Sequence, residues 1–437
     1  AGRAAESRDV SLSQQPSGVT PVFQNLNARS MSRRGGAVAL GGFVIVAIGA
    51  CEPAPQAGGA SVRDSLGVRI VDHGDIDISA LPQWSLEVKP VVSIGVAEGD
   101  DAYQLFGVID AHRSGDGSIA VVDRSRSLRV FDSLGVHVWT TGRRGDGPGE
   151  FGWPQMVTEL SGDSLLVWDV AHSRLTVFSA DGALERTSTV SDLLGDSPSL
   201  GLGASGRLLN EHRVSERTLV DGRPVISTDS EVVLLDVSGG EVTFVGREFL
   251  VAQFEDRDGN FGPATFAVPS VFALAPGGYW YGNTQDHEVR RVTTSGLETV
   301  LRWVGSDRAI SEADYQALLH LWAGGSAATP GLERSMREYG RSMPRAKRFP
   351  AYAELRTDGI DRLWVRDYVR AYADDGTRRW TVFSADGTGV VARLFHSASF
   401  RPVRIGADWI LGVETDEFDV ERVVLREIVL GSERDSS

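Results

Sequence analysis

Six positions with related spacing could together form a metal site, because each ends a short apolar run of the same kind. These positions are Asp123, Asp169, His212, Asn283, Asp367 and Val413. Carboxylate oxygens bind Ca²⁺, and carboxylates with imidazole bind Zn²⁺. If the six runs surround one axis, Asp123, Asp169, His212 and Asp367 are the candidate metal ligands.

The same acidic positions also permit a structural role. An arginine stands at or near the start of the following apolar run in four of the six units: Arg129, Arg174, Arg290 and Arg379. An Asp–Arg pair at this place would hold the two strands of a hairpin together. We favour this pairing and expect no cofactor, with bound Ca²⁺ or Zn²⁺ as the alternative.

Catalytic motifs of other classes are missing from the sequence. The one cysteine, Cys51, excludes an intrachain disulfide and a site of several thiolates. The histidines form neither H-x-x-x-H nor H-E-x-x-H, and no G-x-S-x-G elbow, P-loop or dinucleotide fingerprint occurs. We therefore predict no catalytic residue and favour a binding protein over an enzyme.

The elements that would position the acidic residues are repeated hairpins. "RLTVFSADG" at 174–182 returns as "RWTVFSADG" at 379–387, with a looser copy, "LRVFDSLG", at 128–135. Each copy follows an apolar run that ends in Asp, and the same register gives three weaker copies. The six runs begin at residues 118, 164, 207, 278, 362 and 408. A spacing of roughly 45 residues is typical of a four-stranded propeller blade.

The predicted strands are apolar on both faces. Leu175 and Val177 share one face of their strand, while Phe178 lies on the other. Such a sheet must be covered on both sides, as each blade of a propeller is by its neighbours. The sequence therefore predicts an all-β, six-bladed β-propeller, and we expect the stretch from Trp84 to Ile94 to supply the outer strand of the last blade.

A resemblance to a known family supports this fold. "TTGRRGDGPGEFGWP" at 140–154 resembles the interblade loop of NHL-type propellers, and "SIGVAEGDDAYQLFGV" at 93–108 is a degenerate version of it. From about Trp84 to Leu430 the chain is similar to six-bladed (NHL/TolB-like) propeller proteins of bacterial envelopes. The resemblance implies an architecture and leaves the activity open.

Two insertions interrupt the repeat and are the places where functional loops are expected. Residues 219–266 predict extra strands or a long loop. Residues 308–348 predict two amphipathic helices before the fifth blade, the first with a capping box of Ser311 and Asp314, the second beginning at Thr329 and Pro330. We expect both apolar stripes to pack on the propeller.

Basic residues near these loops are candidates for binding an anion or an acidic polymer. They are Arg143 and Arg144 in the interblade loop and Arg341, Arg345, Lys347 and Arg348 at the end of the second helix. The formal net charge of the whole chain is −15, which argues against nucleic acid as a partner. A solvated surface is the alternative explanation for the basic run.

The first sixty residues predict where in the cell the protein is located. We expect residues 1–30 to be a mis-called or non-native extension. Residues 31–50 have the basic start and apolar centre of a signal peptide, and "IGAC" resembles a lipobox that would make Cys51 the lipidated first residue of the mature chain. A tether at 51–61, the propeller at 62–432 and a polar tail at 433–437 complete the expected organisation.

The sequence thus favours a non-catalytic lipoprotein of the bacterial periplasm or outer surface. It would bind a small ligand or a protein and contact the membrane only through its lipid anchor. Two alternatives stay open at this point. One is a metal-dependent hydrolase, lactonase or lyase acting in the propeller channel, and the other is a scaffold in an envelope complex.

Overall fold

Short β-strands follow one another along nearly all of the chain that the structure describes. The computed structural model describes residues 60–160, 163–189, 199–202, 207–220, 223–236, 242–256, 259–325 and 329–431, all within one compact unit, Pro55–Ser437. Cys51 and the predicted leader lie outside the described residues.

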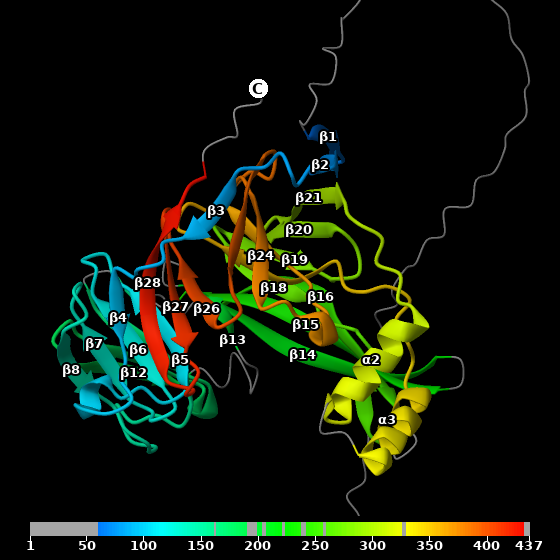
Figure 1. Cartoon of the computed structure of the whole chain (residues 1–437). Helices are drawn as coiled ribbons and strands as arrows, with labels where there is room; N and C mark the ends of the chain where they lie inside the picture. Colours follow the sequence, from blue (N-terminus) through cyan, green and yellow to red (C-terminus); the bar gives the residue numbers. More distant parts are fainter. Residues whose placement is uncertain are drawn as a thin grey trace, which may run out of the picture. The chain divides into compact units, whose positions relative to one another are not determined.

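The strands form antiparallel sheets in which sequence neighbours pair with one another (Figure 1). The first sheet contains β5 (Val108–Arg113), β6 (Ile119–Asp123), β7 (Leu128–Phe131) and β8 (His137–Thr141). The second contains β9 (Pro154–Glu159), β10 (Leu165–Asp169), β11 (Arg174–Phe178) and β12 (Leu184–Thr189). The third contains β13 (Ser199–Leu202), β14 (Arg207–Val220), β15 (Arg223–Asp236), β16 (Val242–Glu255) and β17 (Phe261–Pro263).

The remaining strands form two larger sheets. One has the order β18 (Val271–Ala275), β19 (Gly278–Gly282), β20 (Glu288–Thr293), β21 (Gly296–Val304), β2 (Val68–Asp75) and β1 (Ser61–Ser65). The other has the order β22 (Tyr352–Thr357), β23 (Leu363–Asp367), β24 (Thr377–Phe383), β25 (Val390–Ser397), β3 (Gln83–Leu86), β28 (Glu421–Val429), β27 (Trp409–Thr415) and β26 (Phe400–Ile405), with β4 (Val92–Ile94) also paired to β28.

The repeated apolar runs of the sequence occupy the same place in every unit. They form β6, β10, β14, β19, β23 and β27, each of which pairs on one side with the strand before it and on the other with the strand after it. The predicted position of each repeated run is therefore confirmed, including those of the three weaker copies.

The prediction that both faces of each sheet are buried is confirmed, because side chains on opposite faces of one strand belong to different hydrophobic cores. Leu175 and Val177 of β11 join a core with residues of β15, whereas Phe178 joins a core with residues of β6 and β7. In β6, Ile119 and Val121 face β27 and β28, whereas Ala120 and Val122 face β10. Each sheet is thus held between two others by apolar burial, the main stabilising contribution to folding.

The first strands of successive units lie side by side in a closed series. β5 contacts β9, which contacts β13, which contacts β18, which contacts β22, and β26 contacts β5. Arg356 of β22 completes the series by donating to the Val403 carbonyl of β26. Sheets packed face to face around such a series form a β-propeller, as predicted.

N-terminal strands pair with the last strand of the chain. β4 pairs antiparallel with β28 through Val92–Ile94, and β3 runs between β25 and the end of β28, where Figure 1 shows it beside the red C-terminal strand. The expected stretch from Trp84 to Ile94 therefore forms two short strands. β2 adds in parallel to the edge of another sheet, next to β21.

The two insertions have different structures. In the first, the chain lengthens β14, β15 and β16 to 14 residues each. In the second it forms α2 (Glu312–Trp322) and α3 (Pro330–Ser342). The capping box of Ser311 and Asp314 is present, and Thr329 caps α3 ahead of Pro330, as predicted.

The expected packing of both apolar helix stripes is only half right. Tyr315, Leu318 and Leu319 of α2 are buried against the loops next to β22 and β23. Trp322 and Leu332, however, are 42% and 48% exposed. The reason is that α3 packs mainly on α2, through Gly340, whose lack of a side chain lets the Tyr315 ring approach its backbone.

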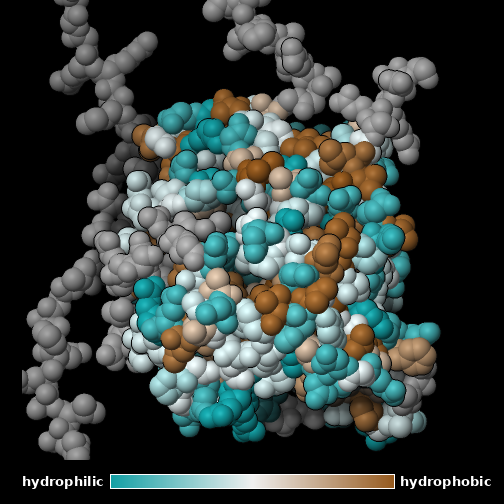
Figure 2. Space-filling view, turned by 90° about the vertical axis from the view of Figure 1, so that its left-hand side faces the viewer, coloured by the Kyte–Doolittle hydropathy of each residue, from teal (hydrophilic) through white to brown (hydrophobic). Residues whose placement is uncertain are grey.

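Hydrophobic residues on one face of the molecule are scattered among hydrophilic ones. Figure 2 shows several separate brown groups within a largely teal and white surface. Exposed apolar side chains on the elements of that side include Leu134, Val136 and Val138. In the part of the chain that the structure describes, none of the helices has the length and apolar character needed to cross a membrane.

Candidate functional site

Asp123 and Asp169, two of the candidate metal ligands, hold the loops between sheets. Asp123 is fully buried, pairs with Arg129 at 2.7 Å and accepts a hydrogen bond from the Phe106 amide at 3.0 Å. Asp169 is also fully buried and accepts the amides of Gly152 and Trp153, both at 2.7 Å. Each carboxylate therefore fixes the loop that enters its own sheet.

The Asp–Arg pairing is not the same in every unit. Asp169 lies 3.7 Å from Arg174 and is bonded more closely by the His172 ring, at 2.8 Å. The pairing expected between Asp367 and Arg379 is wrong, because Arg379 pairs with Asp375 four residues earlier in the chain. A turn rich in aspartate after β23 supplies this nearer partner.

The candidate ligands do not converge among the described side chains. Asp123, Asp169 and Asp367 each bond to groups of their own surroundings. The side chain of His212, on β14, lies outside those described. No three His, Cys, Asp or Glu side chains come together as a possible metal site within the described residues.

The basic candidates lie on the surface and make local contacts. Arg143 is 80% exposed and pairs with Glu150 at 2.6 Å, within the loop that also contains Arg144. In that loop Gly142 has φ +82°, and a side chain there would meet the Phe151 ring. Arg345 lies over the Tyr315 ring, 3.5 Å from its centre. The other basic candidates, Arg341, Lys347 and Arg348, are exposed.

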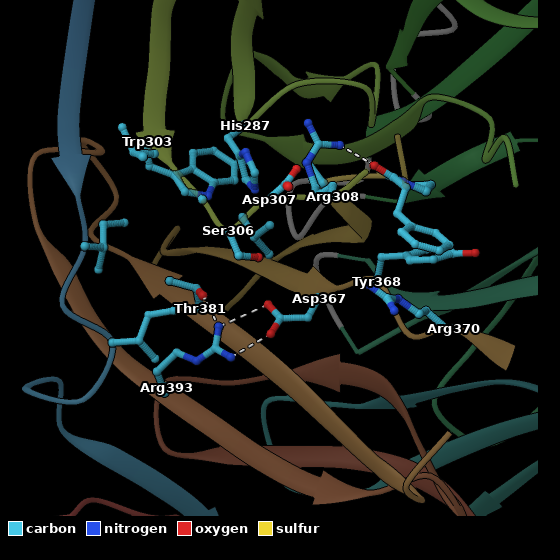
Figure 3. A pocket seen from close by; sticks show the side chains of 18 residues that line it. His287, Trp303, Ser306, Asp307, Arg308, Asp367, Tyr368, Arg370, Thr381 and Arg393 are labelled. Carbon is cyan, nitrogen blue, oxygen red and sulfur yellow. Dashed lines mark hydrogen bonds and ion pairs between the residues drawn. The ribbon is translucent and has the colours of Figure 1, made fainter. Parts of the chain in front are cut away.

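A cavity of about 220 Å³ lies between the β18–β21 sheet and the β22–β25 strands. Its walls come from the ends of β21, β23 and the two flanks of the helical insertion, at 305–308 and 349–351. Figure 3 shows Trp303 and His287 on one side, Asp367 and Arg393 on the other, and Ser306 between them. Asp367 is the one predicted site residue that lines this cavity.

Aromatic rings form part of the wall. Tyr368 stacks on Phe349, with ring centres 6.0 Å apart and planes at 27°. The guanidinium of Arg370 lies 4.2 Å from the centre of the Phe349 ring. Trp303 contacts the His287 ring edge-on at 5.6 Å. Phe349 itself is only 3% exposed, so Tyr368 and Trp303, which are both half-buried, are the rings available to stack on a planar group of a ligand.

The polar wall is held rigidly. Arg393 bonds both oxygens of Asp367, at 3.0 and 2.6 Å, and also donates to the Thr381 hydroxyl. The Arg393 side chain is only 5% exposed, whereas Asp367 is 40% exposed. A bidentate pair of this kind fixes the orientation of the carboxylate, so Asp367 presents a fixed polar group to the cavity.

The surroundings of His287 favour the neutral form of its imidazole. Burial lowers its pKa, the nearby Arg308 lowers it further, and Asp286 and Asp367 act in the opposite direction. Its ring makes no hydrogen bond to another described residue. A side chain at residue 305 would force the His287 ring to move, because a Cβ there would lie 2.0 Å from the His287 Nε2 atom. A neutral imidazole can accept one hydrogen bond and donate another to a bound molecule.

Arg308 connects the cavity to the backbone around it. It donates to the Phe349 carbonyl and, at 2.8 Å, to the Gln285 carbonyl. Burial lowers the pKa of Arg308, Asp286 raises it, and Arg348 lowers it. Both hydrogen bonds of the guanidinium go to neutral carbonyls. Asp307, beside it in the same loop, is exposed.

The cavity therefore offers aromatic and aliphatic surface together with a few fixed polar groups, which is the usual composition of a small-molecule site. No motif in the sequence marks His287, Trp303, Ser306 or Arg393 as site residues. One signal pointed towards them, because the helical insertion interrupts the repeat and both of its flanks line the cavity.

Comparisons with known proteins find similar structures but no similar family. No protein-family model matches the chain, and no curated protein matches its sequence. A structure from the DUF4221 family of Bacteroides vulgatus is 11% identical, with a TM-score of 0.45, and the match covers 80% of this chain and 99% of that one.

Two further solved structures are similar over most of their length. The calcium-binding protein regucalcin from Agrobacterium tumefaciens is 11% identical, with a TM-score of 0.33, and covers 79% of this chain and 96% of its own. Virginiamycin B lyase from Staphylococcus aureus is 11% identical, with a TM-score of 0.32, over 77% and 87%. The fold assignment rests on the strand pairing within this chain.

Proposed function

We propose that the chain is a six-bladed propeller of the NHL/TolB-like kind. The large sheet contains two four-strand units, β22–β25 and β26–β28 with β4, which β3 connects at their edges. Counting these as two blades gives six units, one for each predicted repeat. The helices then precede the fifth blade, and β4 supplies the outer strand of the sixth.

We also propose that the protein is an exported lipoprotein anchored through Cys51. The support is the basic, then apolar, then small-residue order of 31–50 ahead of the one cysteine in the sequence. The membrane contact would be the lipid alone, and the propeller would stand in the periplasm or on the outer surface.

Within this framework we propose that the propeller binds a small planar organic molecule and does not convert it. The observation that supports this most is the cavity itself, which is lined by the Tyr368 ring stacked on Phe349, by the Trp303 ring and by the fixed Asp367–Arg393 pair. Stacking would hold the planar part of the ligand, and the polar pair with His287 would orient its substituents.

A small panel of ligands tests this proposal. Indole-3-acetate, 4-hydroxyphenylacetate, tryptamine and tyramine share aromatic rings and differ in the sign of their charge. At least one should raise the melting temperature in a saturable manner. Stronger stabilisation by the acids would indicate that Arg308 dominates recognition of the ligand's charge, and stronger stabilisation by the amines would indicate that Asp367 does.

The matched variant is Ser306→Trp, which fills the space at the centre of the cavity. Ser295→Trp, in the exposed turn between β20 and β21, is the control for adding an indole elsewhere. Stabilisation by the panel should disappear in Ser306→Trp and persist in Ser295→Trp. Equal stabilisation of both variants, or none in wild type, would contradict the proposed site.

A further inference from the structure

Charged side chains run along the inner edges of the first strands, away from the cavity. Arg404 of β26 bonds both oxygens of Asp110 of β5, at 2.9 and 2.7 Å, and the Val157 carbonyl of β9 at 3.2 Å. Asp110 accepts the Val157 amide at 2.9 Å. Because β5 lies between β26 and β9, a side chain that touches all three strands must follow their inner edge.

A second group of charges joins β22 and β23 to the same edge. Arg356 donates from Nε to Glu354 at 2.6 Å and from Nη1 to the Val403 carbonyl at 3.0 Å. Arg366 donates to the other Glu354 oxygen at 2.8 Å. Burial raises the pKa of Glu354, but Arg356 and Arg366 outweigh it and the net pKa is lowered. One ionised carboxylate thus serves two guanidiniums.

Arg401 lies next to these groups without an acidic partner at ion-pair distance among the described residues. Its Nη2 donates to the Val108 carbonyl at 2.8 Å, while Nε and Nη1 make no hydrogen bond to a described residue. Its side chain is solvent-exposed, yet burial lowers its pKa, Glu421 raises it and Arg356 lowers it again. The guanidinium is therefore partly surrounded by protein and still reached by solvent.

The charges along this edge do not balance. Among the described side chains that interact here, four guanidiniums, those of Arg356, Arg366, Arg401 and Arg404, face three carboxylates, those of Glu354, Asp110 and Glu421. His112 adds no charge, because burial and Arg404 lower its pKa to about 3. A surplus guanidinium with free donors attracts an anion, and the protein around it screens charge less than bulk water does.

We propose that this inner-edge arginine cluster, Arg356, Arg366, Arg401 and Arg404, binds an oxyanion. A carboxylate or a phosphate has the planar or tetrahedral oxygens that a guanidinium fork recognises. Arg401 supplies the free donors, and Arg356 and Arg366 supply the surrounding positive charge. None of the four lines the cavity, so this site is separate from the proposed ligand site.

The experiment measures the melting temperature of the full chain against inorganic phosphate and against malonate, with sodium chloride holding the ionic strength constant. Wild type should show a saturable rise with at least one of the two anions, and the lower Kd identifies the preferred class. Arg401→Gln should raise that Kd at least tenfold. Arg186→Gln, on the exposed strand β12, should leave it unchanged.

Arg401→Lys distinguishes an effect on folding from an effect on anion binding, because it keeps the positive charge and removes the paired donors of the guanidinium. It should melt like wild type without anion and bind the preferred anion several-fold more weakly. An unsaturable rise that is equal in all variants would show a general salt effect and overturn the proposal. Equal Kd values for wild type and Arg401→Gln would overturn it as well.

Discussion

Replacing Asp123 with Asn tests the structural role of the repeated aspartates. One carboxylate oxygen accepts both the Phe106 amide and Arg129, and the other accepts the amide and hydroxyl of Ser125. The side chain is fully buried. Asn has the same shape but only one accepting oxygen, so the NH₂ group must face either Ser125 or the pair formed by Phe106 and Arg129.

The expected loss follows from the bonds that Asn cannot make. Two hydrogen bonds to a charged acceptor contribute about 1.5–3 kcal/mol each, and a buried arginine that loses its partner costs about 3–5 kcal/mol. The cost of an unpaired arginine applies only if the NH₂ group faces Arg129, but either orientation loses two bonds to the carboxylate, so we expect Asp123→Asn to lower the free energy of unfolding by about 3–5 kcal/mol.

Urea unfolding at neutral pH measures this change as a shift of the midpoint at constant slope. The control is Asp181→Asn in the exposed turn between β11 and β12, where surface substitutions change stability by about 0.5 kcal/mol or less. A loss in Asp123→Asn no greater than that in Asp181→Asn would refute the argument that buried aspartates hold the loops.

Three other perturbations have defined outcomes. The pKa of His112 is about 3 in the folded protein against its usual 6.5, so the unfolded state binds more protons between these two pH values. Stability should therefore fall as the pH drops through that range. His112→Gln should reduce this fall, which urea unfolding midpoints at pH 7 and pH 5 would measure. Ser311→Ala removes the cap of α2 and should cost about 1 kcal/mol in the same assay. Cys51→Ala should move the protein from the membrane fraction of a bacterial host to the soluble fraction, and an unchanged distribution would contradict lipid anchoring.

The repeat could be predicted because the strands of each unit can be recognised from the local sequence pattern alone. In β6, β10 and β11, all residues are buried, and the sequence shows this as apolar runs without alternation. The helix caps were predictable for the same reason, since Ser311 and Thr329 act within one turn of their own helices. Local patterns of this kind depend on no distant partner.

The cavity was not predictable, because its residues meet only after distant units have packed. Trp303 lies on β21 and His287 directly before β20 of the same sheet, whereas Arg393 belongs to another sheet, and nothing near them in sequence indicates the encounter. The Asp367 partner shows the same limit. Sequence proximity favoured Arg379, yet Arg393 of β25, two strands away from Asp367, reaches the carboxylate across β24.

The inner-edge arginines were missed for a related reason. Arg356, Arg401 and Arg404 lie on first strands, whose edges carry unpaired backbone groups. Their bonds to the carbonyls of Val403, Val108 and Val157 satisfy those edges. In the sequence they are isolated basic residues within apolar strands, and only the closed series of first strands places them together.

The most direct test of the central claim uses the panel compound that stabilises wild type most. Native mass spectrometry should show one molecule bound per chain in wild type and none in Ser306→Trp, and chromatography after prolonged incubation should recover the compound unchanged. Conversion of the compound in proportion to protein concentration, or the same bound mass in Ser306→Trp, would contradict the account of a non-catalytic cavity that binds a small planar molecule.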